Sequence, residues 1–176
     1  MHPSPPFYPW YAVVSGTDGI EQGDLLLDCP VFSPPEIPDS NSEPEVIRIR
    51  REVIVMTQSC DLQHQKAKEV LLCGLYQRSS IPQNHKLSRI DNLEQARKGS
   101  LPGVHLLQRC EIGGFERELT VVDFSRVYSL PFQFVHREAS RRLHLRLLPP
   151  YREHLSQAFA RFFMRVGLPL DIAPLR

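Results

Sequence analysis

Residues 53–62 decide the fold, and they read Val-Ile-Val-Met-Thr-Gln-Ser-Cys-Asp-Leu. Four consecutive large apolar residues begin the stretch, and such a run is typical of a β-strand that is buried on both faces. Small polar side chains follow at once: a hydroxyl, an amide, a second hydroxyl, a thiol and a carboxylate. A rigid strand that ends in such a cluster is a good support for a site. The sequence therefore predicts ligand binding by Thr57, Gln58, Cys60 and Asp61.

The residues on either side of this stretch predict further strands and few helices. Short runs rich in Val, Leu and Ile alternate with turn residues, which is typical of an antiparallel β body. The expected strands are 25–32, 46–50, 53–57, 68–76, 104–112, 118–130 and 143–147, and a short helix is expected at 91–98. Gly113 and Gly114 separate two of these strands and favour a hairpin turn between them. The fold class is therefore mainly β with some α.

One amphipathic helix is predicted near the C-terminus, over residues 151–166. Its apolar side chains fall on one stripe, formed by Tyr151, Leu155, Ala158, Phe159, Phe162, Phe163 and Val166. An aromatic stripe of this kind predicts that the helix packs on the body. We therefore expect a single domain over residues 1–176, with a β body at 20–147 and a helix at 149–167 packed on it.

The 176 residues carry a formal net charge of +1, so no strong overall field favours nucleic acid. The charges are unevenly distributed, because residues 1–136 hold 13 basic and 17 acidic side chains, whereas residues 137–176 hold 8 and 3. The basic tail predicts salt-dependent nucleic-acid binding through Arg141, Arg142 and Arg146. The alternative is a solvated or protein-facing surface that complements the acidic body.

The cysteines and the apolar segments indicate the cellular compartment of the protein and the cofactors to expect. Cys29, Cys60, Cys73 and Cys110 form no C-x-x-C pair, so we expect free thiols. Cys60 and Cys73 with His64 have loosely usable spacing for zinc, but the paired ligands of zinc sites are absent from the sequence. No signal peptide and no apolar run of about 18 residues is visible. We expect a cytoplasmic protein with no membrane association, no metal and no cofactor.

Cys60, Asp61 and His64 form the sharpest local cluster of reactive side chains. A catalytic thiolate needs a base or a positive partner, which His64 would supply. The neighbouring Asp61 carboxylate opposes a thiolate, and catalytic Cys–His pairs usually come from distant segments. The alternative is a simple turn in which Asp61 caps the chain, Cys60 packs and His64 is solvated.

Three segments in order resemble the PemK/MazF-like family of SH3-like barrels, over about residues 20–130. Gly23-Asp24 precedes the first strand, residues 51–57 read Arg-Glu-Val-Ile-Val-Met-Thr, and residues 119–127 read Leu-Thr-Val-Val-Asp-Phe-Ser-Arg-Val. The turn at residues 57–62 is also similar to that of uncharacterised bacterial proteins with a Ser/Thr-Gln-x-Cys-Asp motif.

The resemblance implies a small antiparallel SH3-like β-barrel and a bacterial toxin–antitoxin or phage-defence setting. Family members that cleave RNA use an arginine at the start of the second strand, and Arg51 matches that position. They also use a hydroxyl after the third strand, where this chain has Gly74-Leu75-Tyr76. The resemblance therefore carries over Arg51 as a candidate catalytic residue without its usual hydroxyl partner.

Two classes of function follow from these observations. The first is a binding module whose partner is nucleic acid or protein, with a homodimer as one form of protein partner. The second is a hydrolytic enzyme, either an endoribonuclease that uses Arg51 or an enzyme that depends on Cys60. A catalytic hydroxyl or acid close to Arg51 would favour the ribonuclease, and His64 or His105 beside an exposed Cys60 would favour the thiol enzyme.

Overall fold

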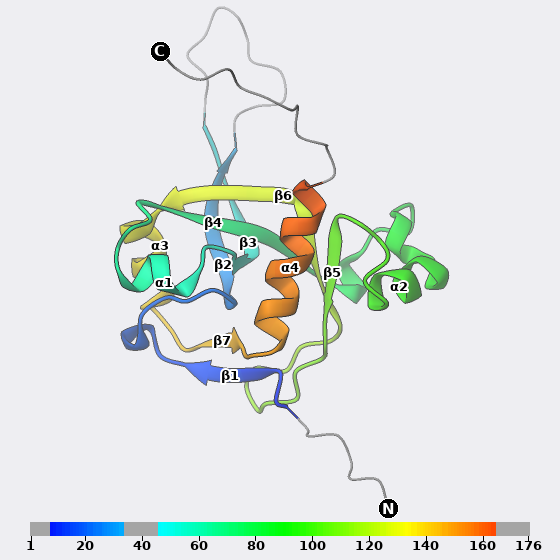
Figure 1. Ribbon diagram of the computed structural model, residues 1–176, viewed down its shortest axis with the longest axis horizontal. Coiled ribbons are helices and arrows are strands. Elements are labelled where there is room, and N and C mark those ends of the chain that lie inside the picture. Colours follow the sequence, from blue (N-terminus) through cyan, green and yellow to red (C-terminus); the bar gives the residue numbers. More distant parts are fainter. Residues whose placement is uncertain (1–7, 34–45, 165–176) are drawn as a thin grey trace, which may run out of the picture.

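The fold is built on one strongly curved antiparallel sheet of seven strands, with helices on both of its faces (Figure 1). The computed structural model describes residues 8–33 and 46–164. The strands are β1 (Tyr11–Val14), β2 (Asp24–Ser33), β3 (Ile47–Val55), β4 (Glu69–Gln77), β5 (Val104–Leu107), β6 (Thr120–Pro131) and β7 (His144–Leu147). Their order is β1-β7-β2-β3-β4-β6-β5. The predicted antiparallel β body is therefore present.

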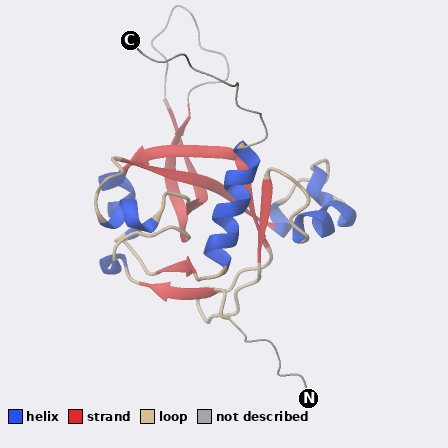
Figure 2. Cartoon of the chain, in the orientation of Figure 1, coloured by secondary structure: helices blue, strands red, loops and turns tan. Residues whose placement is uncertain are grey.

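Helices connect the strands at the ends of the sheet and cross one of its faces (Figure 2). The α-helices of the described residues are α1 (Ser59–Gln63), α2 (Ile90–Arg97), α3 (Phe132–Ala139) and α4 (Tyr151–Phe163). Three short 3-10 helices are η1 (Gly16–Asp18), η2 (Arg78–Ser80) and η3 (Lys86–Ser88). The segment from η2 through α2 forms an excursion between β4 and β5, beside the sheet (Figure 1). The expected helix at 91–98 lies within this excursion, as α2.

The sheet stays open, which corrects the predicted SH3-like barrel. Its end strands are β1 and β5, and no backbone ladder joins them among the described residues. The curvature nevertheless brings them close, because the Tyr11 hydroxyl donates a hydrogen bond of 2.6 Å to the Gln108 carbonyl. Each end strand has only four residues. A side-chain contact between short strands therefore replaces the ladder that would close a barrel.

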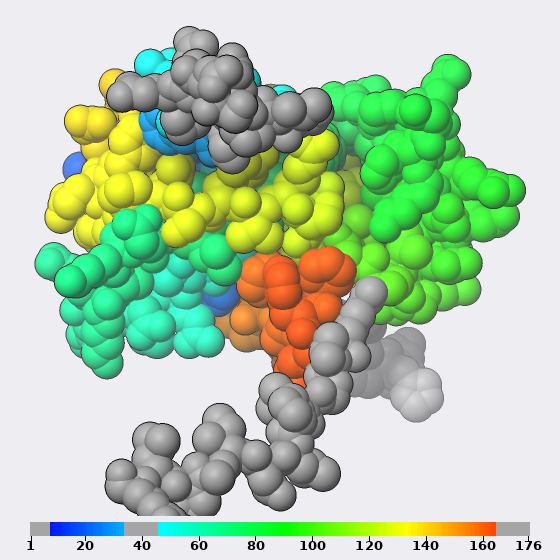
Figure 3. All heavy atoms as spheres, turned by 90° about the horizontal axis from the view of Figure 1, so that it is seen from above, coloured from blue at the N-terminus to red at the C-terminus, as the bar shows by residue number. Residues whose placement is uncertain are grey.

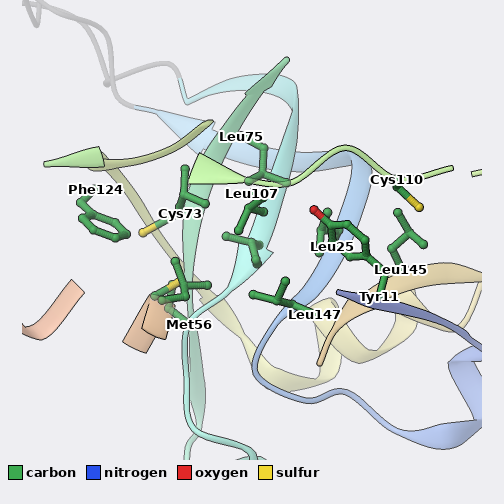
Figure 4. Packing of buried hydrophobic residues seen from close by; sticks show 13 residues of the cluster. Tyr11, Leu25, Met56, Cys73, Leu75, Leu107, Cys110, Phe124, Leu145 and Leu147 are labelled. Carbon is green, nitrogen blue, oxygen red and sulfur yellow. The ribbon is translucent and has the colours of Figure 1, made fainter. Parts of the chain in front are cut away.

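Two hydrophobic cores lie on the two faces of the sheet. The first contains Cys73, Phe124 and Leu145 (Figure 4). Ile54 and the fully buried Leu155 of α4 also belong to it. The second lies under α1 and α3 and is formed by Leu26, Val31, Val53, Val55, Leu62, Val70, Leu72, Leu130 and Val135, with several smaller neighbours. Residues 53–55 at the end of β3 thus enter opposite cores in turn, which confirms the predicted burial on both faces for this part of the strand.

Helix α4 packs on the body as predicted, but one aromatic side chain of its predicted apolar stripe, that of Phe163, stays exposed. Phe159 and Phe162 contact Phe124, with ring centroids 5.3 and 6.0 Å apart. Phe163 is 57% exposed, so the expected stripe is one residue too wide. The remainder of the predicted helix, from Arg165 onwards, lies outside the described residues.

The hairpin between β2 and β3 contains a bulge. Leu26 pairs with Val53 and Cys29 with Arg51, so two residues of β2 lie opposite one residue of β3. Asp28 adopts a left-handed conformation there, with φ of 59°. Its carboxylate accepts a hydrogen bond of 2.8 Å from Arg50. The bulge therefore bends β2 away from the regular ladder.

Candidate functional site

Two of the five polar side chains at the end of β3 hold the backbone. Thr57 Oγ1 accepts a 2.7 Å hydrogen bond from the Leu71 N–H, and Ser59 Oγ accepts one of 3.1 Å from the Gln22 N–H. Gln58 begins α1 but makes no side-chain cap. Of the four side chains predicted to bind a ligand here, Thr57 is thus occupied, whereas Gln58 and Cys60 are exposed and Asp61 is half-buried.

Cys60 makes no hydrogen bond to a histidine among the described residues. Its Sγ lies 3.7 Å from Gln58 Oε1 and 3.9 Å from Asp61 Oδ1. His64 is exposed at the end of α1 and makes no side-chain hydrogen bond, and His105 lies on β5, in a groove shared with α4. The geometry therefore does not assemble the thiol–imidazole pair that a Cys60-dependent enzyme needs.

A buried ionic network lies next to this turn. Arg146 Nη2 donates to Asp24 Oδ2 at 2.9 Å, and Arg146 Nη1 donates to Glu21 Oε1 at 2.8 Å. Asp24 is completely buried, and His144 Nε2 lies 3.2 Å from its Oδ2. Burial alone would raise the Asp24 pKa, but the Arg146 guanidinium, the adjacent His144 ring and the Glu21 N–H outweigh burial and lower it. Asp24 is therefore ionised and paired.

This network shows where sequence-based prediction missed important residues. Glu21 also accepts a 3.1 Å hydrogen bond from Arg152 of α4, so the network ties β2, β7 and α4 together. Gln22 donates a 2.8 Å hydrogen bond to the Met56 carbonyl at the end of β3. The Glu-Gln-Gly-Asp sequence predicted only a turn, since nothing local indicates partners more than a hundred residues away.

The predicted basic surface of the tail is only partly present. Arg146 was expected to bind nucleic acid, but it is 8% exposed and its donors are taken by carboxylates. Arg141 is exposed and pairs with Glu138 at 2.9 Å. Arg142 is exposed and donates to the Leu27 carbonyl at 2.8 Å. The three arginines therefore do not form one free cationic patch.

The strand register brings Arg51 to a different polar surface. Val53 pairs with Gly74, and Gly74 pairs with Asp123. Directly paired residues point to the same face of a sheet, and so do alternate residues of one strand. Arg51, Gly74, Tyr76 and Asp123 therefore share one face, contributed by β3, β4 and β6.

Arg126 and Tyr128 complete this surface, which we call the β3–β4–β6 face. A Cβ atom on Gly74 would lie 3.1 Å from the Arg126 Cβ, so the glycine makes room for the arginine. Tyr128 pairs with Leu72, two residues before Gly74, and so points to the same side. The face consists of Arg51, Gly74, Tyr76, Asp123, Arg126 and Tyr128.

The electrostatics of the β3–β4–β6 face differ from those of the buried network. Arg51 and Arg126 are exposed, and neither forms an ion pair within the described ranges 8–33 and 46–164. Tyr76 and Tyr128 are half-buried. Burial raises the Tyr76 pKa, and the nearby charges of Arg126 and Arg51 only partly oppose that increase. The face thus combines two cations whose charge is not neutralised with two aromatic rings.

A small cavity adjoins the face where the excursion meets the sheet. It has a volume of about 140 Å³, and its lining residues include Tyr76, His85, Asp123 and Arg126. Its floor is apolar and includes the buried Leu87. Figure 3 shows β6, in yellow, open to solvent on this side with the excursion, in green, next to it. An engineered cavity of ~150 Å³ holds a benzene ring, so this one admits a single planar ring.

Comparisons with known proteins do not assign the sequence to a family. No family model matches the sequence, and no curated protein matches it significantly. Across residues 8–33 and 46–164, no group of three His, Cys, Asp or Glu side chains could hold a metal ion. No helix of the described part has the length and apolar character needed to cross a membrane.

Proposed function

We propose that the protein is a binding module for single-stranded nucleic acid and that the β3–β4–β6 face is its interface. The observation that carries this proposal is the position of two exposed arginines without carboxylate partners around half-buried tyrosines. Cations that track the backbone, combined with rings on which bases stack, are the usual elements of single-strand recognition. By contrast, Arg141 and Arg146 of the basic tail are paired with carboxylates, and Arg142 donates to the Leu27 carbonyl.

Each group on the face has a separate role in this proposal. Arg51 and Arg126 contact phosphates, and the ring of Tyr76 stacks on a base. A neighbouring base enters the cavity, where Asp123 accepts a hydrogen bond from its exocyclic amino group. The Asp123 Oδ1 atom already accepts from the Ser125 N–H and hydroxyl, so Oδ2 is the atom that faces the base.

The resemblance to PemK/MazF-like proteins fits the same face. Under this proposal the open sheet is a divergent SH3-like barrel, and Arg51 occupies the position of the family's strand arginine. A toxin–antitoxin or phage-defence setting then follows as part of the proposal.

A ribonuclease is the second candidate function, because His85 and Asp123 both line the cavity beside Arg126. His85 Nδ1 accepts from the Leu87 N–H at 3.2 Å, which leaves Nε2 as the atom able to take part in proton transfer. Cleavage of RNA but not of DNA, lost in His85→Ala, would identify this function.

The test is a titration of fluorescent single-stranded RNA and DNA oligonucleotides with the full chain. We expect Arg51→Met and Arg126→Met each to weaken binding by about tenfold, and Tyr76→Leu to weaken it by ~1–3 kcal/mol. Arg48→Met is the matched control, because Arg48 is exposed on the same strand but points to the opposite face. Equal losses in Arg48→Met and Arg51→Met, or no binding at low salt, would reject the proposal.

A further inference from the structure

A second cavity opens where strands β2 and β7 separate. The two strands pair only at Asp24 with Arg146 and at Leu25 with Leu145, and then they diverge around the bulge of β2. The space between them has a volume of about 260 Å³. Its walls are largely apolar and include Leu25, Leu27, Phe115, Ala139, Leu143 and Leu145. It opens to solvent beside Leu143, which is 54% exposed.

Two nitrogen atoms give this cavity a polar character that packing alone does not explain. Among the described residues, only Arg117 Nε and His144 Nε2 are buried side-chain atoms without a hydrogen-bond partner, and both residues line the cavity. Arg117 is 7% exposed. His144 Nε2 is within ion-pair distance of Asp24 but lacks hydrogen-bond geometry. Buried donors are nearly always satisfied, and His144 has the Asp24 carboxylate beside it, so Arg117 Nε is the atom that indicates a ligand acceptor between apolar walls.

The charges around the cavity select the kind of ligand. The Arg117 guanidinium is already neutralised, because its Nη2 forms an ion pair with Glu52. Arg142 and Glu138 also line the cavity, but Arg142 donates to a backbone carbonyl and Glu138 pairs with Arg141. Glu116 is a further lining carboxylate, and it would repel an anion. Cys29 contributes no charge either, since burial raises the pKa of its thiol to about 11. A neutral acceptor oxygen therefore suits the Arg117 Nε–H better than a carboxylate does.

We propose that the cavity between β2 and β7 binds a small, mainly apolar, uncharged molecule through one carbonyl oxygen, which accepts a hydrogen bond from Arg117 Nε. The site is separate from the β3–β4–β6 face, so it extends the nucleic-acid proposal without depending on it. A volume of about 260 Å³ limits the ligand to roughly the size of one substituted ring.

Three probes of similar size test the proposal: acetophenone, benzoate and ethylbenzene. Each is titrated into the ¹⁵N-labelled full chain, and amide shifts are followed by NMR. Acetophenone should give saturable shifts at Gly114, Phe115 and Leu143, with a dissociation constant on the order of 1 mM. Ethylbenzene lacks the acceptor and benzoate carries a charge, so each should bind about tenfold more weakly.

Two variants check the location and the hydrogen bond. Arg117→Lys keeps a cation for Glu52 but loses the Nε–H, so acetophenone should bind it no better than ethylbenzene does. Leu143→Trp should block the mouth and abolish binding of all three probes without unfolding, and Ile90→Trp is its control at a site that is 74% exposed. If Arg117→Lys does not fold, Leu143→Trp decides alone. Tightest binding by benzoate, absence of saturable shifts, or shifts that survive Leu143→Trp would overturn the proposal.

Discussion

Arg146 and Arg51 both lie on strands of the same sheet, yet they have opposite surroundings. Arg146 is buried, and its guanidinium is held by Asp24 and Glu21. Arg51 is exposed and has no ion-pair partner among the described residues. Desolvating a charged group costs several kcal/mol unless it is paired, so Arg146 requires its carboxylates whereas Arg51 requires none. The first arginine therefore belongs to the fold, and the second is available to a ligand.

This contrast shows that a count of charges along the chain does not reveal which arginines are free. Residues 137–176 contain 8 of the 21 basic side chains, but the described arginines among them that were predicted to bind nucleic acid are paired or buried. Arg51 and Arg126 lie in the part of the chain that is acidic overall. The availability of an arginine for phosphate thus depends on its neighbours in space and not on the local net charge.

The largest effect is expected from removing the buried arginine of this pair, Arg146. Arg146→Met leaves the Asp24 carboxylate buried without its main partner, so it should lower the free energy of unfolding by about 3–5 kcal/mol. Chemical denaturation measures this loss. Arg51→Met is the control and should change stability by no more than ~0.5 kcal/mol. Similar losses in the two variants would contradict the assignment of Arg146 to the fold.

Helix α4 offers the same contrast between a buried and an exposed side chain of apolar type. Leu155 is fully buried, whereas Phe163 is 57% exposed. Leu155→Ala should therefore cost about 2–5 kcal/mol, and Phe163→Ala less than about 1 kcal/mol although it removes more atoms. Thermal and chemical unfolding of both variants would show the difference. A larger loss in Phe163→Ala would mean that the helix packs through the other edge of its stripe.

The sequence was sufficient for those parts of the fold that depend on local pattern. The apolar run that begins at Val53 predicted a strand buried on both faces, and the stripe from Tyr151 predicted a helix packed on the body. The closed barrel was wrong because closure depends on whether β1 and β5 meet, and these short strands are far apart in sequence. Local pattern carries no information on such a contact.

Of the residues that form the β3–β4–β6 face, only Arg51 was predicted from the sequence. Arg51 was identified through a family resemblance, but Arg126 and Tyr76 were not, because only the strand register brings them to the same face. Three extra residues of β6 between the partners of Cys73 and Gly74 interrupt that register, so counting along the chain would not have located Arg126. In the cluster at the end of β3, Thr57 and Ser59 hold the backbone, and ligand binding by its other members stays a prediction.

The salt dependence of nucleic-acid binding tests the role of the exposed arginines. If Arg51 and Arg126 each contact one phosphate of a single strand, each should contribute about 0.7 to the slope of log affinity against log salt concentration. The double variant Arg51→Met, Arg126→Met should therefore flatten that slope by about 1.4. Binding measured at four or more salt concentrations gives the value. A flatter slope in Arg141→Met and Arg142→Met instead would move the interface back to the tail.

The smallest effect is expected at Cys60. There, alkylation that follows from solvent exposure must be distinguished from alkylation of an activated thiol. Cys60 is exposed, whereas Cys29, Cys73 and Cys110 are buried. Burial also raises the pKa of Cys29 to about 11 and that of Cys73 to about 12, so both have very little thiolate at neutral pH. Iodoacetamide should therefore label Cys60 first, simply because it is accessible. The informative quantity is the rate at Cys60 compared with that of free cysteine. We expect the two rates to agree within about threefold, since the hydrogen-bond partners of its sulfur among the described residues are the Gln58 and Asp61 oxygens. A rate more than about tenfold higher would show an activated thiol and would favour a Cys60-dependent enzyme over a binding module.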